Sequence, residues 1–135
     1  MKPFLAGFVS TLVFHQGLLS VFYALGLAPR APYSMEPTGP LHIPQVLSLA
    51  FWGGVWGIVL WLVIGSAQTA PAYWLGAIVF GALAPSAVAL FVVFPLKGLP
   101  FAGGWQPTWI AGALLLNGTW GFGVALFMRL FNRVE

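Results

Sequence analysis

Four long apolar stretches constrain the fold of this chain more than any other feature of the sequence. They cover residues 4–27, 45–64, 72–94 and 108–130, and none of them contains Asp, Glu or Lys. In a helix, about 20 apolar residues rising 1.5 Å each cross the roughly 30 Å hydrocarbon core of a bilayer. An isolated strand would leave its backbone polar groups unpaired in lipid. The sequence therefore predicts an all-α membrane protein with four transmembrane helices, in one integral membrane domain covering residues 1–135.

The composition agrees with a membrane protein and excludes several other classes. Hydrophobic residues make up 60% of the chain and charged residues only 5%, whereas soluble domains carry about 25% charged residues. The net charge of +3 comes from five basic and two acidic residues, which is too few for a nucleic-acid-binding surface. We therefore expect membrane lipids as partners and no nucleic acid. The absence of cysteine excludes disulfides, thiolate metal sites and a cysteine nucleophile.

The basic residues predict an orientation. Lys2, Arg129 and Arg133 flank one side of the expected bundle, whereas Arg30 and Lys97 lie on the other. Cytoplasmic loops of membrane proteins carry an excess of Lys and Arg. The three-to-two distribution favours cytoplasmic termini.

The two halves of the sequence resemble each other. Gly54-Val55-Trp56-Gly57 recurs 64 residues later as Gly118-Thr119-Trp120-Gly121, with Gly53 matching Asn117, and Leu75-Gly76 echoes Ala6-Gly7. These echoes predict two tandem two-helix repeats with the same orientation in the membrane. The alternative is chance, since Gly and Trp are common in apolar helices. Inverted repeats are typical of many transporters, so a parallel repeat lowers the expectation of a transporter.

Polar residues mark the middle of the first stretch. His15 is the twelfth of its 24 residues, and a polar interruption at that depth also favours a span over a signal peptide. Ionisable groups near the midplane are costly and face other helices, water or a ligand. At 100° per residue Thr11 shares a face with His15, and Gln16, Ser20 and Tyr23 share the neighbouring face.

The same polar residues have three interpretations. We expect them to join helices within a bundle or between subunits, with Asn117, in the fourth stretch, as a partner. A second interpretation is a path for protons or small solutes along Gln16, Ser20, Tyr23 and Asn117. A third is haem or pigment ligation by His15. A second midplane histidine is missing, because the only other one, His42, lies in a loop. No cofactor and no metal site is therefore expected.

Small residues in the second and fourth stretches predict close helix packing. Gly residues along one face let two backbones approach, and polar side chains then hydrogen-bond across the interface. The residues expected to do this are Gly53, Gly57, Gly118 and Gly121.

Two proline-rich loops, residues 28–44 and 95–107, are expected on the side opposite the termini. They contain the charged and titratable residues Arg30, Glu36, His42 and Lys97. One carboxylate without a nucleophile or a second carboxylate is too little for acid–base catalysis. We expect Glu36 to pair with Arg30 or Lys97 and to fix a loop cap. The alternative is that this cap docks a larger membrane or periplasmic partner.

Three stretches of the sequence resemble a known group of proteins. Leu12-Val13-Phe14-His15-Gln16-Gly17, residues 47–57 (LSLAFWGGVWG) and Val93-Phe94-Pro95-Leu96-Lys97-Gly98 are similar to those of uncharacterised small four-span inner-membrane proteins of proteobacteria. The resemblance implies a multi-pass protein of the bacterial inner membrane and no assigned activity.

The residues and the resemblance together predict a protein that is not an enzyme. The expected function is a structural or accessory subunit of a membrane assembly, or a helix-packed homo-oligomer, with other subunits or a second copy as partners. A small channel or transporter and a haem- or pigment-binding protein are the alternatives.

Overall fold

The computed structural model describes residues 1–133 and contains four helical segments long and apolar enough to cross a membrane. They are Lys2–Ala24, Gln45–Ile64, Ala70–Leu96 and Pro107–Arg133. The predicted all-α, four-span architecture is confirmed. Three spans differ from their predicted bounds by a few residues. For example, the third begins at Ala70 because the Thr69 hydroxyl accepts a hydrogen bond from the Ala72 N–H and caps the helix.

The secondary-structure elements follow the chain in this order. The first span comprises α1 (Lys2–Ser10), a π-helical turn η1 (Thr11–His15) and α2 (Gln16–Ala24), and the second is α3 (Gln45–Ile64). The third comprises α4 (Ala70–Val88), a π-helical turn η2 (Ala89–Val93) and α5 (Phe94–Leu96), and the fourth is α6 (Pro107–Arg133). The short antiparallel strands β1 (Pro37–Thr38) and β2 (Ile43–Pro44) form a hairpin, and a 3₁₀ segment η3 (Phe101–Trp105) precedes α6.

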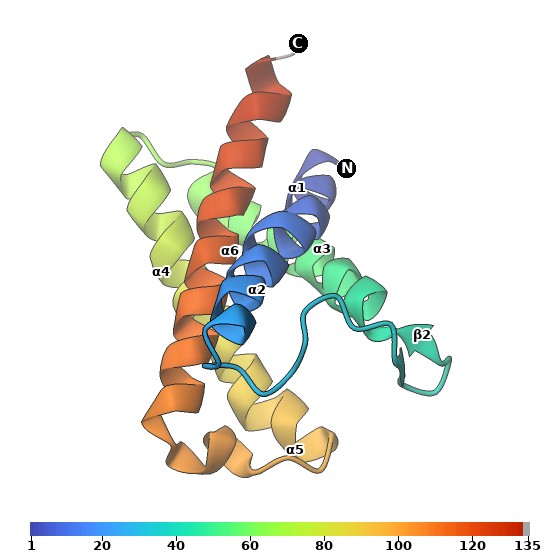
Figure 1. Ribbon diagram of the computed structural model, residues 1–135. Coiled ribbons are helices and arrows are strands. Elements are labelled where there is room, and N and C mark those ends of the chain that lie inside the picture. The colour runs from blue at the N-terminus through green and yellow to red at the C-terminus, as the bar shows by residue number, and fades with distance from the viewer. Residues whose placement is uncertain (134–135) are drawn as a thin grey trace.

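Figure 1 shows that both termini and the connection 65–69 lie at one end of the bundle, which we call the terminal side. The loops 25–44 and 97–106 lie at the other end, the loop side. α1 packs on α3, α4 packs on α6, and α6 also packs on α1. Toward the loop side α3 diverges from α4 and α5 (Figure 1).

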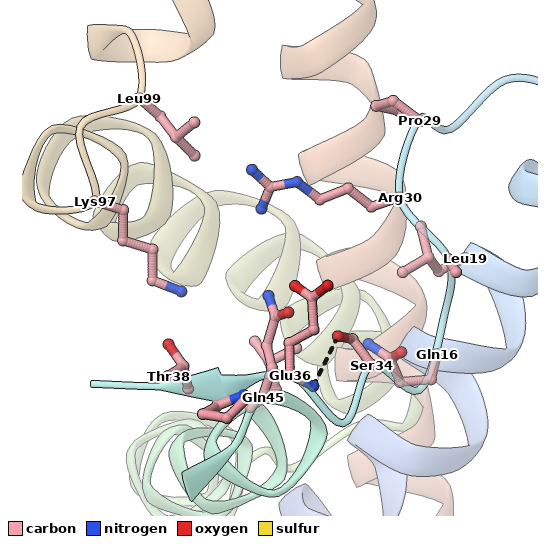
Figure 2. A pocket seen from close by; sticks show the side chains of 13 residues that line it. Gln16, Leu19, Pro29, Arg30, Ser34, Glu36, Thr38, Gln45, Lys97 and Leu99 are labelled. Carbon is pink, nitrogen blue, oxygen red and sulfur yellow. Dashed lines mark hydrogen bonds between the residues drawn. The ribbon is translucent and has the colours of Figure 1, made fainter. Parts of the chain in front are cut away.

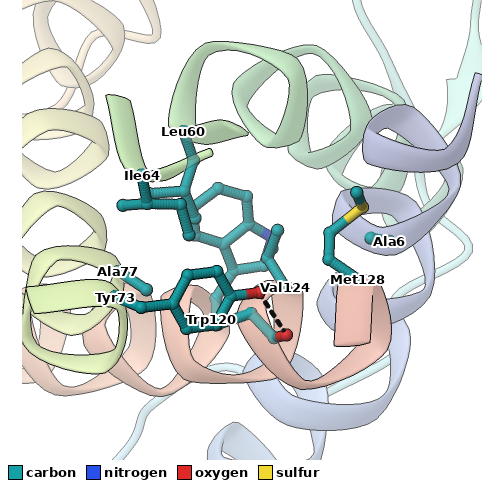
Figure 3. Packing of buried hydrophobic residues seen from close by; sticks show 9 residues of the cluster. Ala6, Leu60, Ile64, Tyr73, Ala77, Trp120, Val124 and Met128 are labelled. Carbon is teal, nitrogen blue, oxygen red and sulfur yellow. Dashed lines mark hydrogen bonds between the residues drawn. The ribbon is translucent and has the colours of Figure 1, made fainter. Parts of the chain in front are cut away.

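A buried hydrophobic cluster joins the four spans on the terminal half of the bundle (Figure 3). Trp120 of α6 lies at its centre, and its indole N–H donates to the Gly7 carbonyl of α1 at 3.1 Å. The Tyr73 hydroxyl donates to the Ala125 carbonyl at 2.7 Å. The other cluster members come from all four spans and are Ala6, Leu60, Ile64, Ala77, Val124, Ala125 and Met128. This packing closes the terminal half of the bundle.

The two helix pairs pack in the same register. A Cβ on Gly7 would collide with the Gly53 carbonyl and come within 3.0 Å of the Gly57 Cα. A Cβ on Gly81 would come within 2.6 Å of the Asn117 carbonyl and 2.9 Å of the Gly121 Cα. Gly53 and Asn117 are 64 residues apart, as are Gly57 and Gly121, so the fourth span meets the third as the second meets the first.

This register corrects one part of the sequence alignment. The residue equivalent to Gly7 is Gly81, whereas the sequence echo pointed to Gly76. A Cβ on Gly76 would touch only the Ile64 side chain, at 3.3 Å. The sequence comparison failed here because the first and third spans share a contact position and almost no residue types.

Spans one and three also end in the same way. Leu27 N–H donates to the Phe22 carbonyl at 2.8 Å, and Leu99 N–H donates to the Phe94 carbonyl at 2.9 Å. The residues directly before these two leucines are Gly26 and Gly98, each with φ of 73°. This is the glycine C-cap, in which a residue in the left-handed conformation turns the chain so that backbone N–H groups donate to the last carbonyls of the helix. The cap ends the first span at Ala24 and turns both loops away from their helices in the same way.

Candidate functional site

A loop residue, Tyr33, is anchored to the π-helical turn of the first span. In a regular α-helix the Gln16 N–H would donate to the Leu12 carbonyl, but here it donates to Thr11. The Tyr33 hydroxyl donates to the Leu12 carbonyl at 2.6 Å, and the Tyr33 N–H donates to the Gln16 side-chain oxygen at 2.8 Å. Tyr33 has φ of 53°, a conformation that costs energy for a residue with a Cβ. The two hydrogen bonds hold it there.

Gln16 also orients His15. Because its amide oxygen accepts from Tyr33, its Nε2 group is the donor toward His15 Nδ1, at 3.3 Å. Accepting at Nδ1 leaves the neutral imidazole with its proton on Nε2. His42 lies in the turn between β1 and β2, with φ of 50°, well separated along the chain from the span that carries His15.

Two other polar residues of the first span, Thr11 and Ser20, bond to their own helix. Thr11 donates to the Gly7 carbonyl at 3.0 Å and Ser20 to the Gln16 carbonyl at 2.8 Å. Tyr23 is 48% exposed. Within residues 1–133 neither the Thr11 nor the Ser20 hydroxyl bonds to another helix, although Thr11 packs against α3, where a Cβ on Gly53 would collide with the Thr11 hydroxyl. Ser10, which is not among the predicted residues, bridges helices, because its hydroxyl donates to the Trp120 carbonyl at 2.7 Å.

Asn117 lies in a different polar group from His15 and Gln16. Its Nδ2 donates to the Ser86 hydroxyl at 3.0 Å, and Ser86 in turn donates to the Ala113 carbonyl at 3.0 Å. The pairing of Asn117 with the first span is thus corrected to a link between α6 and α4. The signal that could have found Ser86 is its place beside Pro85, where a polar residue interrupts an otherwise apolar span.

The predicted small-residue contacts lie on both helix pairs. A Cβ on Gly57 would collide with the Pro3 carbonyl, and one on Gly121 with the Ala77 carbonyl. A Cβ on Gly53 would collide with the Thr11 hydroxyl. Gly118 has more room, because the nearest atom to its Cβ would be that of Ala82, at 3.4 Å.

A pocket of about 620 Å³ opens on the loop side, between the first two spans, the end of α5 and the loop 25–38 (Figure 2). Its volume lies within the range of roughly 300–1,000 Å³ typical of small-molecule sites. Polar and charged lining residues are Gln16, Arg30, Ser34, Glu36, Thr38, Gln45 and Lys97, and the others are Leu19, Pro29, Ala31, Pro37, Leu49 and Leu99. The pocket therefore combines a polar and an apolar wall.

Three charged side chains of the pocket point toward one open space. Figure 2 shows Arg30 and Lys97 reaching into it from different elements and Glu36 from below. Within residues 1–133 no ion pair of 4.0 Å or less joins Glu36 to Arg30 or Lys97, so the expected pairing is wrong. The Glu36 backbone N–H instead donates to the Ser34 hydroxyl at 3.3 Å. Of the four predicted cap residues, three line the pocket and His42 does not.

The pocket reaches from the membrane boundary into the span. Lys97 directly follows α5 and Gln45 begins α3, so both lie where helices leave the hydrocarbon region. Gln16 lies eight residues before the end of the first span, which is roughly 12 Å along the helix axis. Its side chain is 2% exposed and forms part of the pocket floor.

This arrangement has the properties of a binding site. Its two cations can hold an anion, and its hydroxyl, amide and carboxylate groups can accept or donate hydrogen bonds. Among residues 1–133 no group of three or more His, Cys, Asp or Glu side chains is placed to hold a metal ion. No protein-family model, curated protein or solved structure matches the chain.

Proposed function

We propose that this chain is a non-catalytic integral membrane protein that holds an amphipathic ligand in its loop-side pocket. The observation that carries the proposal is the convergence of Arg30, Lys97 and Glu36 on one open space without ion pairs among them. All three residues are exposed, so their charged groups can contact a ligand, and the two cations can form charge-assisted hydrogen bonds with an anionic group. A ligand with a charged end and an apolar body would match the polar and apolar walls of the pocket.

The chemistry of the pocket supports a binding role over catalysis. Glu36 is its one carboxylate, and no histidine lines it. General acid–base or nucleophilic catalysis needs an activated nucleophile or a second proton-transferring group within hydrogen-bond reach. The Ser34 hydroxyl accepts from the Glu36 N–H at 3.3 Å, and within residues 1–133 no base lies within hydrogen-bond distance of it.

The separation of the polar groups supports holding a ligand over conducting ions. Gln16 and His15 are joined to the loop through Tyr33, whereas Asn117 bonds to Ser86 on another helix pair. Buried apolar side chains around Trp120 fill the terminal half of the bundle (Figure 3). A conducting path would need polar groups or water across that half.

A second candidate function is an accessory subunit or homo-oligomer in a bacterial inner membrane, with cytoplasmic termini. The subunit role is favoured by Trp52, which is 58% exposed and lies roughly 10 Å inside the span from Gln45. Tryptophan is usually enriched at the membrane interface. The Phe51 ring packs on both Trp52 and Phe4, with centroids 5.6 and 5.8 Å away. An aromatic surface facing lipid at this depth suits a helix of another subunit.

Cysteine accessibility tests the ligand-holding proposal, because the chain has no native cysteine. A Ser34→Cys variant places a thiol in the pocket, and a Ser66→Cys variant places one in the exposed connection on the terminal side. Both are treated in mild detergent with a water-soluble maleimide, with and without a total membrane lipid and metabolite extract. We expect the extract to slow labelling of the Ser34→Cys variant only.

Equal labelling of the Ser34→Cys variant with and without the extract would contradict the ligand-holding proposal. Mass analysis of the same purified protein tests the second candidate. A stoichiometric partner protein or a stable homo-oligomer, lost on Trp52→Ala, would favour the subunit role. A monomer without a partner would remove it.

A further inference from the structure

We infer that the ligand of the loop-side pocket is a phospholipid with one net negative charge, whose phosphodiester group lies between Arg30 and Lys97. This inference rests on the proposed ligand-holding function and names the class of ligand. Four features of the pocket carry it: its charge balance, its hydrogen-bonding groups, its apolar wall and its depth in the membrane.

Charge balance favours an anionic ligand. Arg30, Lys97 and Glu36 are the charged residues that line the pocket, so its net charge is +1. A phosphodiester carries one negative charge and would bring the occupied pocket to neutrality. A zwitterionic headgroup would leave the net positive charge of the pocket uncompensated. The guanidinium of Arg30 suits two-point contact with phosphate oxygens, and the ammonium of Lys97 adds a point charge.

The remaining polar groups suit a headgroup with hydroxyls. In Figure 2 the side chains of Glu36, Gln45 and Thr38 point toward the space that Arg30 and Lys97 enter. An ionised carboxylate only accepts hydrogen bonds. A polyol such as glycerol, attached to the phosphate, would donate its hydroxyl protons to Glu36 and to the Gln45 side-chain oxygen. This gives the one acidic residue of the pocket a partner that does not compete for the cations.

The apolar wall provides a way out for acyl chains. Leu19, Leu49 and Leu99 line the pocket from α2, α3 and the segment after α5. On this side α3 diverges from α4 and α5 (Figure 1), and the pocket is lined from both the first and the second span. A volume of about 620 Å³ accommodates a headgroup and its ester-linked glycerol, while the chains lie outside along the helices.

The depth of the pocket matches that of lipid phosphates. Both cations lie beyond the ends of their spans: Lys97 is the first residue after Leu96, and Arg30 follows Ala24 by six residues. Leu19, Leu49 and Gln16 lie within the spans, whereas Leu99 follows the end of the third span by three residues. A phospholipid in the surrounding leaflet therefore enters without moving its phosphate along the membrane normal. A water-soluble phosphate compound would match the cations but would leave the leucine wall without contacts.

Native mass spectrometry of the full chain in mild detergent tests the inference. The protein is equilibrated with equimolar phosphatidylglycerol, phosphatidylethanolamine and phosphatidylcholine, and retained lipid is counted. We expect phosphatidylglycerol to be retained in preference, and retention to fall about tenfold in Arg30→Gln and in Lys97→Gln, because each loses a charge-assisted hydrogen bond. Arg133→Gln removes one positive charge from the terminal side and is expected to leave retention unchanged.

The apolar wall has its own matched pair of variants. Leu49→Phe narrows the pocket, whereas Leu47→Phe changes an exposed residue of the same helix. Only Leu49→Phe is expected to reduce retention. Circular dichroism and size-exclusion profiles of each variant are compared with those of the parent protein, so that loss of folding is not mistaken for loss of binding.

Several outcomes would overturn the inference. They are equal retention of the three lipids, preference for a zwitterionic lipid, or unchanged retention in the Arg30→Gln/Lys97→Gln double variant. Protection of the Ser34→Cys thiol by glycerol 3-phosphate alone, as strongly as by phosphatidylglycerol, would point to a soluble phosphate compound. Protection by the membrane extract without any lipid selectivity would leave the ligand-holding function standing and reject the phospholipid. No protection by any of these would reject both.

Discussion

The two helix pairs use the same glycine contacts but differ in what their polar side chains reach. Gly7 meets Gly53 and Gly57 in the first pair as Gly81 meets Asn117 and Gly121 in the second. In the second pair Asn117 bonds to Ser86, so that polar group closes within the pair. In the first pair the Gln16 side chain and the Leu12 carbonyl instead bind Tyr33 of the loop. The comparison shows that small residues set the packing of each pair. The polar residues decide whether a pair hydrogen-bonds only within itself, which we call closed, or also to the loop beside the pocket, which we call connected.

Removing the close approach should have the largest effect and should affect both pairs alike. Gly57→Leu and Gly121→Leu each place a side chain against backbone carbonyls, of Pro3 and Ala77 respectively. Backbone atoms in packed helices cannot move aside cheaply, so each variant should lose about 3 kcal/mol or more of stability. Unfolding in a detergent titration, followed by circular dichroism, measures the loss.

The matched controls are Gly17→Leu and Gly112→Leu, because a Cβ at either position would meet nothing within 4 Å. Both should remain near the parent stability. If the losses of stability in Gly57→Leu and Gly121→Leu differed widely, the two pairs would not be equivalent.

Replacing the mid-span amide side chain of each pair should show a difference between the two pairs. Gln16→Leu and Asn117→Leu should each cost about 1–2 kcal/mol, because buried hydrogen-bonding groups lose their partner. Gln16→Leu should in addition release the loop. Limited trypsin digestion at Arg30 would then rise about tenfold, since a drop of about 1.4 kcal/mol in the free energy of local opening gives that factor.

Asn117→Leu should leave cleavage at Arg30 as it is in the parent protein. Tyr33→Phe provides an independent check, because it removes only the hydrogen bond to the Leu12 carbonyl. Faster cleavage at Arg30 in Asn117→Leu, or no increase in cleavage in Gln16→Leu, would contradict the division into a closed and a connected pair.

The smallest expected effect concerns two equivalent tryptophans. The Trp120 indole donates to the Gly7 carbonyl, whereas the Trp56 ring packs edge-on against Phe80 at 6.2 Å. Trp120→Phe should therefore cost about 1 kcal/mol more than Trp56→Phe, from the lost hydrogen bond. The difference in unfolding midpoint between the two variants measures it, and an equal loss would show that the hydrogen bond to the Gly7 carbonyl adds no stability.

The spans were predictable because they follow from hydropathy and length alone. Pro44 and Gly65 bracket the second span, and α3 runs from Gln45 to Ile64, as predicted. The close contacts at Gly53, Gly57 and Gly121 also follow from local sequence, since a small residue recurring every four positions lies on one face of a helix.

The pocket was not predictable, and the reason lies in the loop. Its position depends on Tyr33 adopting a left-handed conformation that local propensity disfavours. That conformation is stabilised by Gln16 and Leu12, which lie 17 and 21 residues away in sequence. The Leu12 carbonyl is available to Tyr33 because the π-helical turn directs the Gln16 N–H to Thr11 instead. No residue pattern in the first span predicts this turn. Proximity of Arg30, Glu36 and Lys97 was foreseen, but their failure to pair depends on side-chain positions.

The division of the pocket between the two halves has a consequence for cutting the chain. Arg30, Glu36 and Gln45 come from the first half and Lys97 and Leu99 from the second. A break within the exposed connection 65–69 would give two fragments, each with its own glycine-packed helix pair and neither with a complete binding site. Co-expressed fragments that reassociate should regain ligand binding, while either fragment alone should not. Binding would then report on fragment complementation.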